Sequence, residues 1–208
     1  MKKTSPRNPV IVGIAGGSAS GKTWLADYLL RALGKRAVLI SQDWYYRDQS
    51  AITGAAAREL NFDHPRAFET MLMMKHLREL REHRGVQSPV YDYANHSRLD
   101  ATTPVSPADL ILVEGLFVLH ETALRRLLDV SVFVDVPADI RLMRRLRRDA
   151  GERGIPVEET LRLYERFVRP MHERFVQPSG RHATHIWRPL TDRAFPARIR
   201  RNLKEMLS

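Results

Sequence analysis

The sequence predicts a single α/β domain in which helices flank a parallel β-sheet. Several short segments are almost wholly apolar and rich in β-branched residues, which is typical of strands buried on both faces. Helical patterns occur between these segments. The length of 208 residues suits one domain with a sizeable core. The expected strands are residues 10–15, 37–40, 110–115, 130–136 and 183–187.

The first predicted strand runs into a phosphate-binding motif. From Gly16 to Thr23 the residues follow the P-loop order G-x-x-x-x-G-K-[ST]. Small residues let backbone N–H groups surround a phosphate, and a helix from Thr23 to Leu33 directs its positive end at it. Lys22 can reach the outer phosphates, and the Thr23 hydroxyl can bind Mg²⁺. The predicted triphosphate-binding residues are Gly16, Gly17, Ser18, Ala19, Ser20, Gly21, Lys22, Thr23 and Trp24.

The composition limits the partners and the compartment. The net charge is +10, and residues 139–208 hold 17 of the 34 Lys/Arg but only 9 of the 24 Asp/Glu. This bias predicts a polyanionic partner, either nucleic acid or the phosphates of a nucleotide. No run of 18 apolar residues is present, so we expect no membrane span. The absence of cysteine excludes disulfides and fits the reducing cytoplasm, where we expect the protein.

Two acidic residues stand at the ends of predicted strands. Asp43 follows residues 37–40, and Glu114 closes residues 110–115. Ligands of open α/β sheets bind at the carboxyl ends of strands, so Asp43 either faces the phosphates or is an ordinary turn residue. In P-loop enzymes an acid at the end of a neighbouring strand binds Mg²⁺, directly or through water. We predict this role for Glu114, with a plain charged strand end as the alternative.

An insertion at residues 84–105 is expected to form a small β-hairpin. A rigid turn at 61–65 and a helix at 66–83 precede it. Residues 89–98 alternate like a short exposed hairpin strand and are rich in aromatic side chains. Tyr91, Tyr93 and His96 either clamp a flat ring or pack a small sheet.

A basic region at residues 138–178 is expected to form a helical lid. The predicted helix 138–150 carries five arginines, and Gly151 to Gly154 are expected to break it. The next helix begins after Pro156 and extends to about Val168, where Pro170 bends or ends it. Such a helix pair can close over phosphates and exclude water. The alternatives are a solvated basic helix and a nucleic-acid surface.

From about Val10 to Ile186 the chain resembles the uridine kinases (uridine–cytidine kinases). The turn Asn61-Phe62-Asp63-His64-Pro65 and the Tyr91…His96 spacing are specific to that family rather than to P-loops at large. The other matching stretches are the P-loop itself, Ser41-Gln42-Asp43 with Tyr45-Tyr46, Pro89 to Tyr93 with His96-Ser97-Arg98, Glu114-Gly115-Leu116, Phe133-Val134-Asp135, Arg144-Arg145 with Arg148-Asp149, Glu152-Arg153-Gly154, and Val168 to Met171. The resemblance implies ATP-dependent phosphorylation of the 5′-hydroxyl of uridine or cytidine.

The resemblance also implies roles for individual residues. Asp43 would take the proton from the ribose 5′-hydroxyl, and Asp63 and Arg145 would hold the ribose hydroxyls. Tyr91 and His96 would read the pyrimidine edge. The remaining residues are Phe62 and Tyr46 in the nucleoside site, Thr23 and Glu114 for Mg²⁺, and Lys22, Arg148 and Arg153 as catalytic cations. The family is often tetrameric and is inhibited by end-product triphosphates, which implies a homo-oligomer here.

Some positions depart from the family's pattern. Ile155 stands where an arginine usually follows Glu-Arg-Gly, Leu163 replaces a usual glutamine, and Trp24 replaces a second Ser or Thr after the P-loop lysine. Residues 183–186 replace the usual Ala-Asp-hydrophobic run. The preferred nucleoside stays open, and one alternative is a kinase of another nucleoside or small hydroxylated metabolite. The other is a non-catalytic nucleotide- or nucleic-acid-binding protein, which the lack of a recognised nucleic-acid module disfavours.

Overall fold

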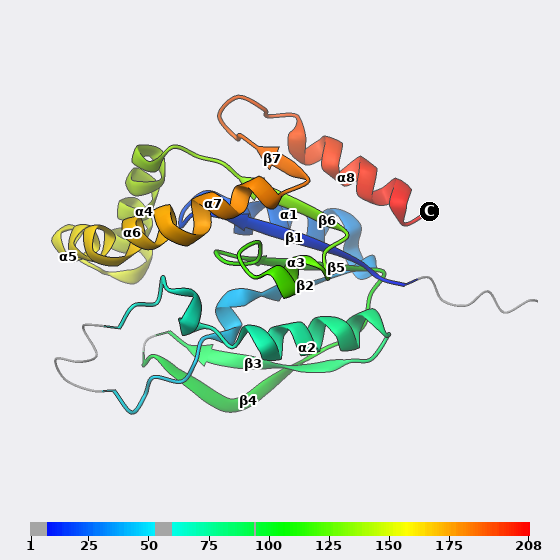
Figure 1. Cartoon of the computed structure of the whole chain (residues 1–208), viewed down its shortest axis with the longest axis horizontal. Coiled ribbons are helices and arrows are strands. Elements are labelled where there is room, and N and C mark those ends of the chain that lie inside the picture. The colour runs from blue at the N-terminus through cyan, green and yellow to red at the C-terminus, as the bar shows by residue number, and fades with distance from the viewer. Residues whose placement is uncertain (1–7, 53–59, 94) are drawn as a thin grey trace, which may run out of the picture.

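A five-stranded parallel sheet forms the centre of the molecule in the computed structural model, which describes residues 8–52, 60–93 and 95–208 (Figure 1). The strand order is β2-β5-β1-β6-β7, and β1 pairs in parallel with both β5 and β6. The predicted fold class is therefore confirmed. The strands are β1 (Val10–Gly16), β2 (Ala37–Ser41), β5 (Leu110–Gly115), β6 (Val130–Val134) and β7 (His185–Trp187).

Helices cover both faces of this sheet, giving three layers (Figure 1). On one face α1 (Lys22–Leu33) and α8 (Phe195–Met206) pack against the strands, and on the other α2 (Thr70–Arg81) and α3 (Thr122–Arg125) do so. Alternating residues of β1 serve the two cores: Ile11 and Ala15 face α2, and Val12 and Ile14 face α1. Burial on both faces explains why the strands read as continuous apolar runs.

The insertion forms a two-stranded antiparallel sheet of β3 (Val86–Asp92) and β4 (Ser97–Val105), which runs beside α2 (Figure 1). The sequence predicts a single strand over residues 89–98, but this stretch holds the end of β3, the turn and the start of β4. Helix α2 also begins later than predicted. Phe68 is extended and bridges to Tyr46, so the helix cannot start before Thr70.

The basic region forms α4 (Ala138–Arg153), α5 (Val157–Leu163) and a continuing helical segment that includes α6 (Arg169–Met171) and α7 (Gln177–Ser179). The helix ends within the predicted break at residues 151–154, although later than the predicted helix 138–150: α4 continues to Arg153 and ends at Gly154, whose φ of 64° favours glycine.

Pro170 does not end its helix, because π-helical turns at Tyr164–Val168 and His172–Val176 widen the coil just before Pro170 and Pro178. The two turns belong to consecutive similar stretches, YERFVRPM and HERFVQPS.

Candidate active site

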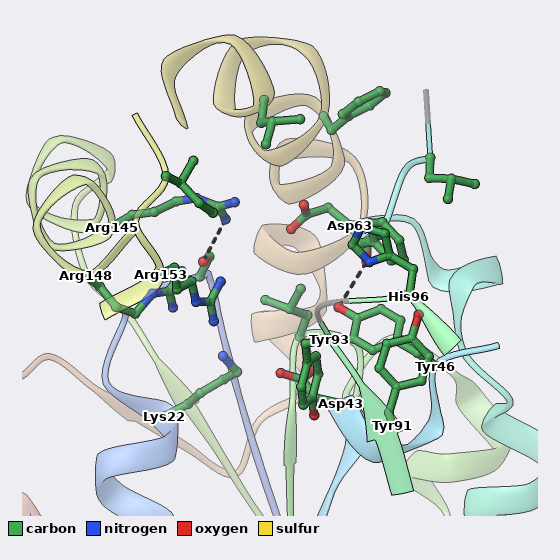
Figure 2. Close-up of a pocket in the computed structure, with 17 residues that line it drawn as sticks. Lys22, Asp43, Tyr46, Asp63, Tyr91, Tyr93, His96, Arg145, Arg148 and Arg153 are labelled. Atoms are coloured by element: carbon green, nitrogen blue, oxygen red, sulfur yellow. Dashed lines mark hydrogen bonds between the residues drawn. The ribbon is translucent and has the colours of Figure 1, made fainter. Parts of the chain in front are cut away.

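A cavity of about 560 Å³ lies beyond the carboxyl ends of β1 and β2, between the P-loop, the hairpin and the basic helices (Figure 2). Its size suits a small-molecule ligand. All the residues that the sequence assigns to catalysis and to nucleoside binding line it. They are Lys22, Asp43, Tyr46, Phe62, Asp63, Tyr91, His96, Arg145, Arg148 and Arg153.

The P-loop forms the floor of this cavity on the side of β1. A Cβ atom on Gly16 would lie 2.6 Å from Ser20 Oγ and 2.8 Å from the Val134 carbonyl oxygen, so only glycine permits this tight turn. Gly21 precedes α1 with a φ of 95°, which also favours glycine. Lys22 is the first residue of α1, and its side chain points into the cavity (Figure 2). The loop therefore presents a helix N-terminus and a lysine to one space, as anion binding requires.

Glu114 and Thr23 come together beside the P-loop because β5 pairs directly with β1. The Thr23 hydroxyl donates to Glu114 Oε2 at 3.3 Å, and the Ser41 hydroxyl donates to Glu114 Oε1 at 2.8 Å. Burial raises the pKa of Glu114, and the nearby Asp43 adds to the shift, while Lys22 opposes it. A buried carboxylate and two hydroxyls are hard oxygen ligands, and a divalent cation there would relieve the cost of the buried charge.

Two carboxylates face the cavity from separate turns. Asp43 lies in the 3-10 turn directly after β2, and Asp63 lies in a turn where its N–H donates to Asn61 Oδ1 at 3.0 Å. Burial raises the pKa of Asp63, the charge of Asp43 raises it further, and Arg145 opposes the rise. Asp43 and Asp63 are thus close enough to influence each other. A ligand that donates hydroxyl hydrogens suits this pair.

Aromatic rings form the wall opposite the arginines (Figure 2). The rings of Phe62 and His96 lie 4.6 Å apart between centroids, and those of Tyr46 and Tyr91 lie 5.2 Å apart. His96 has a φ of 51°, a strained backbone for a residue that is not glycine. The Tyr91 hydroxyl is buried and has no hydrogen-bond partner in the described part of the chain. This wall can therefore accommodate a ligand that has a flat ring and a group that hydrogen-bonds the Tyr91 hydroxyl.

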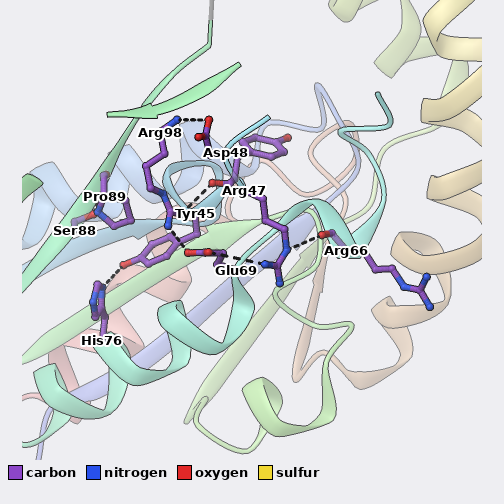
Figure 3. A network of polar contacts seen from close by, with 10 residues as sticks. Tyr45, Arg47, Asp48, Arg66, Glu69, His76, Ser88, Pro89 and Arg98 are labelled. Atoms are coloured by element: carbon purple, nitrogen blue, oxygen red, sulfur yellow. Dashed lines mark hydrogen bonds and ion pairs between the residues drawn. The ribbon is translucent and has the colours of Figure 1, made fainter. Parts of the chain in front are cut away.

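A network of polar contacts fastens this wall to the core (Figure 3). Arg98 on β4 forms an ion pair with Glu69, and its guanidinium donates to the Tyr46 carbonyl oxygen at 3.0 Å. Its backbone N–H donates to Asp48 Oδ1 at 3.3 Å. The hairpin is therefore attached to the backbone of a residue that itself lines the cavity. On the same network the Tyr45 hydroxyl lies 2.9 Å from His76 Nδ1.

The basic helices supply the third wall. Arg145 and Arg148 lie on α4, and Arg153 is its last residue. Arg145 Nη1 donates to the Ser18 hydroxyl at 3.1 Å, so α4 contacts the P-loop directly. Apolar side chains complete this side, and two of them, Ile155 and Leu163, are the positions that depart from the resemblance.

A second cavity of about 400 Å³ lies on the other side of the P-loop. Trp24, half exposed, stacks on Tyr28 with ring centroids 5.6 Å apart and lies 5.9 Å from the ring of Trp187. The cavity thus has an aromatic wall beside a phosphate-binding loop. Its lining is Ser20, Gly21, Trp24, Arg144, Trp187, Pro189, Arg193 and Pro196.

The predicted triphosphate-binding residues divide between the two spaces. Ser18 and Lys22 line the first cavity, and Ser20, Gly21 and Trp24 line the second. Gly16, Gly17, Ala19 and Thr23 line neither, and neither does Glu114.

Sequence reasoning missed several lining residues. They come from distant segments with no common motif, whereas Tyr93, which also lines the first cavity, belongs to the predicted aromatic group of the hairpin. The missed residues are Leu60, Leu116 and Phe167 in the first cavity, and Arg144, Trp187, Pro189, Arg193 and Pro196 in the second.

Within residues 8–52, 60–93 and 95–208, no helix is long and apolar enough to cross a membrane. Within the same ranges, no three or more His, Cys, Asp and Glu side chains gather as a metal site.

The parallel sheet, the glycine-rich turn into α1 and the strand-end carboxylates define a P-loop protein. The model of the phosphoribulokinase / uridine kinase family matches residues 11–194, and the chain belongs to this family of phosphotransferases. A uridine kinase of Staphylococcus epidermidis is 45% identical over 177 residues, covering 85% of this chain and 86% of the relative. A uridine kinase of Geobacillus sp. is 44% identical over 181 residues, covering 86% of each protein.

Solved structures agree on the fold. D-glycerate 3-kinase from Cryptococcus neoformans superposes with a TM-score of 0.66 at 18% identity, covering 86% of this chain and 82% of that one. Phosphoribulokinase from Rhodobacter spheroides superposes with a TM-score of 0.61 at 16% identity, covering 85% of this chain and 68% of that one.

Proposed function

We propose that this protein transfers the γ-phosphoryl group of ATP to the 5′-hydroxyl of a pyrimidine ribonucleoside, converting uridine to UMP or cytidine to CMP. Its family and its relatives named uridine kinase support this activity. The observation that carries the proposal is a single cavity lined by Lys22, by Asp43 and by the aromatic pair Tyr91 and His96. A phosphate-binding group, a proton acceptor and a wall for a flat base thus share one space.

ATP would lie across the P-loop with its base in the second cavity. Ser20 and Gly21 line the second cavity while Ser18 and Lys22 line the first, so the loop separates the two spaces. A base can stack on Trp24 and Trp187, because the π-face of every base accepts an aromatic ring. The phosphates would then bind the loop's N–H groups and point the γ-phosphate at Lys22 and the nucleoside.

Thr23 and Glu114 would hold Mg²⁺, together with oxygens of the phosphates. Mg²⁺ is usually bound by one or two carboxylates plus substrate phosphates, so one buried glutamate and one hydroxyl suffice. Bound there, the ion neutralises charge that develops on the phosphates during transfer.

Asp43 would accept the proton of the 5′-hydroxyl as that oxygen attacks the γ-phosphorus and the bond to the bridging oxygen of ADP breaks. A positioned base contributes on the order of 10²–10⁴ in rate. Asp63 and Arg145 would hold the ribose hydroxyls, and their shared place in the lining of the cavity supports a common ligand. Lys22, Arg148 and Arg153 would stabilise the charge on the transferring group.

The base would lie between Phe62 and the lid, with Tyr91 and His96 at its polar edge and Tyr46 behind them. The unpartnered Tyr91 hydroxyl supports this position, because a buried donor without a partner is costly until a ligand satisfies it. We further propose a homotetramer in the cytoplasm, on the family resemblance alone.

A second candidate function is phosphorylation of another nucleoside or small hydroxylated metabolite. The specific observation behind it is the apolar lid side of the cavity, where Ile155 and Leu163 offer no hydrogen bonds to a base.

A panel of acceptors decides between these functions. Purified protein, Mg²⁺ and ATP are incubated with uridine, cytidine, purine nucleosides and hydroxylated metabolites, and ADP release is followed. We expect uridine and cytidine to give the highest kcat/KM. Turnover of another acceptor only would establish the second candidate, and no turnover together with strongly salt-dependent nucleic-acid binding would support a binding protein.

A further inference from the structure

Asp149 lies behind the basic wall of the cavity rather than in it. It sits on α4, and only 1% of its side chain is exposed. Its carboxylate contacts three arginines: Oδ2 lies 3.1 Å from Arg145 Nε, and Oδ1 lies 2.8 Å from Arg148 Nη2 and 3.6 Å from Arg153 Nη1. All three arginines line the cavity, whereas Asp149 is not among the lining residues.

The charges of this cluster do not cancel. One carboxylate and three guanidinium groups leave a net charge of about +2, and that excess faces the cavity. Three like charges within so short a stretch of chain repel one another and, without a common anion, would turn toward solvent. Asp149 therefore holds the arginines together without removing the positive charge that a phosphoryl group needs.

Asp149 also connects the end of α4 to the P-loop. The Asp149 carbonyl oxygen accepts the N–H groups of Gly154 and Ile155, the latter at 2.9 Å, which fixes the turn after α4. Arg145 reaches from Asp149 to the Ser18 hydroxyl of the P-loop at 3.1 Å. A chain of contacts thus runs from Asp149 through Arg145 to the phosphate-binding loop.

We propose that Asp149 is a positioning residue for phosphoryl transfer, acting through Arg145, Arg148 and Arg153. This rests on the proposed function of the cavity. A buried carboxylate is costly to desolvate and is retained where charge-assisted hydrogen bonds compensate for it, as those from Arg148 Nε and Nη2 do here. A displacement of about 1 Å in catalytic groups can lower a rate by about 10²-fold. We therefore expect a large loss of kcat when all three arginines lose their common partner.

The test compares Asp149→Asn with Glu152→Gln. Glu152 lies on the same helix and is exposed, and both variants remove one negative charge. We expect Asp149→Asn to lower kcat by about 10²-fold with a small change in Tm, and Glu152→Gln to stay within about threefold of the wild type. In an Arg148→Ala background, Asp149→Asn should lower kcat by a smaller factor than in the wild type, because one of the three arginines that Asp149 positions is already gone.

Equal losses of kcat in both backgrounds would overturn the proposal, as would an unchanged kcat in Asp149→Asn. If Asp149→Asn does not fold, Asp149→Glu tests the proposal in its place, because this variant keeps the charge but displaces the carboxylate. A folded Asp149→Glu protein with a tenfold loss of kcat supports positioning, and near-wild-type kcat or failure of both variants to fold overturns it.

Binding of inorganic tripolyphosphate, measured by calorimetry, separates this proposal from the proposed function. If the wild type phosphorylates no nucleoside, the proposed function fails, but Asp149→Asn should still weaken tripolyphosphate binding relative to Glu152→Gln. Equal binding by the two variants would count against Asp149 even in an active enzyme.

Discussion

The Tyr91 hydroxyl offers a prediction in which stability and substrate binding change in opposite directions. Tyr91 is 6% exposed, and its hydroxyl is buried with no partner in the described part of the chain. Burial raises the pKa of Tyr91 to about 12, so the group remains a neutral donor at physiological pH. Tyr91→Phe removes this unsatisfied group while keeping the ring that contacts Tyr46.

The expected magnitudes follow from the cost of buried polar groups. An unsatisfied buried donor costs about 1–3 kcal/mol. The free energy of unfolding of the ligand-free protein should therefore rise by at least about 1 kcal/mol in Tyr91→Phe. In a domain of this size that raises Tm by about 2–4 °C. Losing one hydrogen bond to the base, worth about 0.5–1.5 kcal/mol, should raise the nucleoside Kd by about 2- to 10-fold.

Tyr45→Phe provides the matched control. The Tyr45 hydroxyl is also buried, but it lies 2.9 Å from His76 Nδ1, so its removal breaks a bond and leaves the histidine unsatisfied. We expect Tm to fall and nucleoside binding to stay unchanged. Thermal melts and calorimetric titration with uridine measure both properties. A lower Tm with unchanged nucleoside affinity in Tyr91→Phe would refute the role assigned to Tyr91.

Three further predictions concern the metal, the ATP base and the nucleoside. Burial raises the pKa of Glu114, so the native state binds that proton more tightly than the unfolded chain does. The free energy of unfolding therefore falls as the pH rises from the usual carboxyl range through the raised pKa. Glu114→Gln should flatten this fall in thermal melts without ligand and weaken Mg²⁺-dependent ATP binding. Trp24→Ala should raise the KM for ATP by about 5- to 100-fold, with the KM for uridine unchanged in steady-state assays. Ile155→Arg should lower the KM for uridine by about tenfold, since a hydrogen bond from a charged donor is worth about 1.5–3 kcal/mol, and an unchanged KM would remove this position from base recognition.

The local parts of the fold could be predicted from the sequence. The P-loop, the buried strands and the acids at their ends depend on neighbouring residues and on the rule that parallel strands end at one edge of the sheet. The start of α2 could not be predicted, because Phe68 is held extended by a bridge to Tyr46, which is remote in sequence. The sequence left open whether Pro170 bends or ends its helix, and the helix does not end there because a π-turn directly before it accommodates the proline.

The site divides in the same way. Asp43 and Glu114 were identifiable from their place after strands, and the resemblance indicated Asp63 and His96. The second cavity could not be predicted. Trp24 lies on α1 and Trp187 on β7, and the two rings meet only because β7 pairs with β6 in the folded sheet. Asp149 was visible within a matching motif, but its three arginine partners are a property of the folded helix.

Asp43→Asn tests the central claim most directly. The substitution keeps the size of the side chain and removes the proton acceptor that shares the cavity with Lys22. We predict that uridine still binds, by calorimetry, with an affinity within about threefold of the wild type, while kcat falls by about 10²–10⁴-fold. A kcat close to that of the wild type would contradict the assignment of Asp43 as the catalytic base.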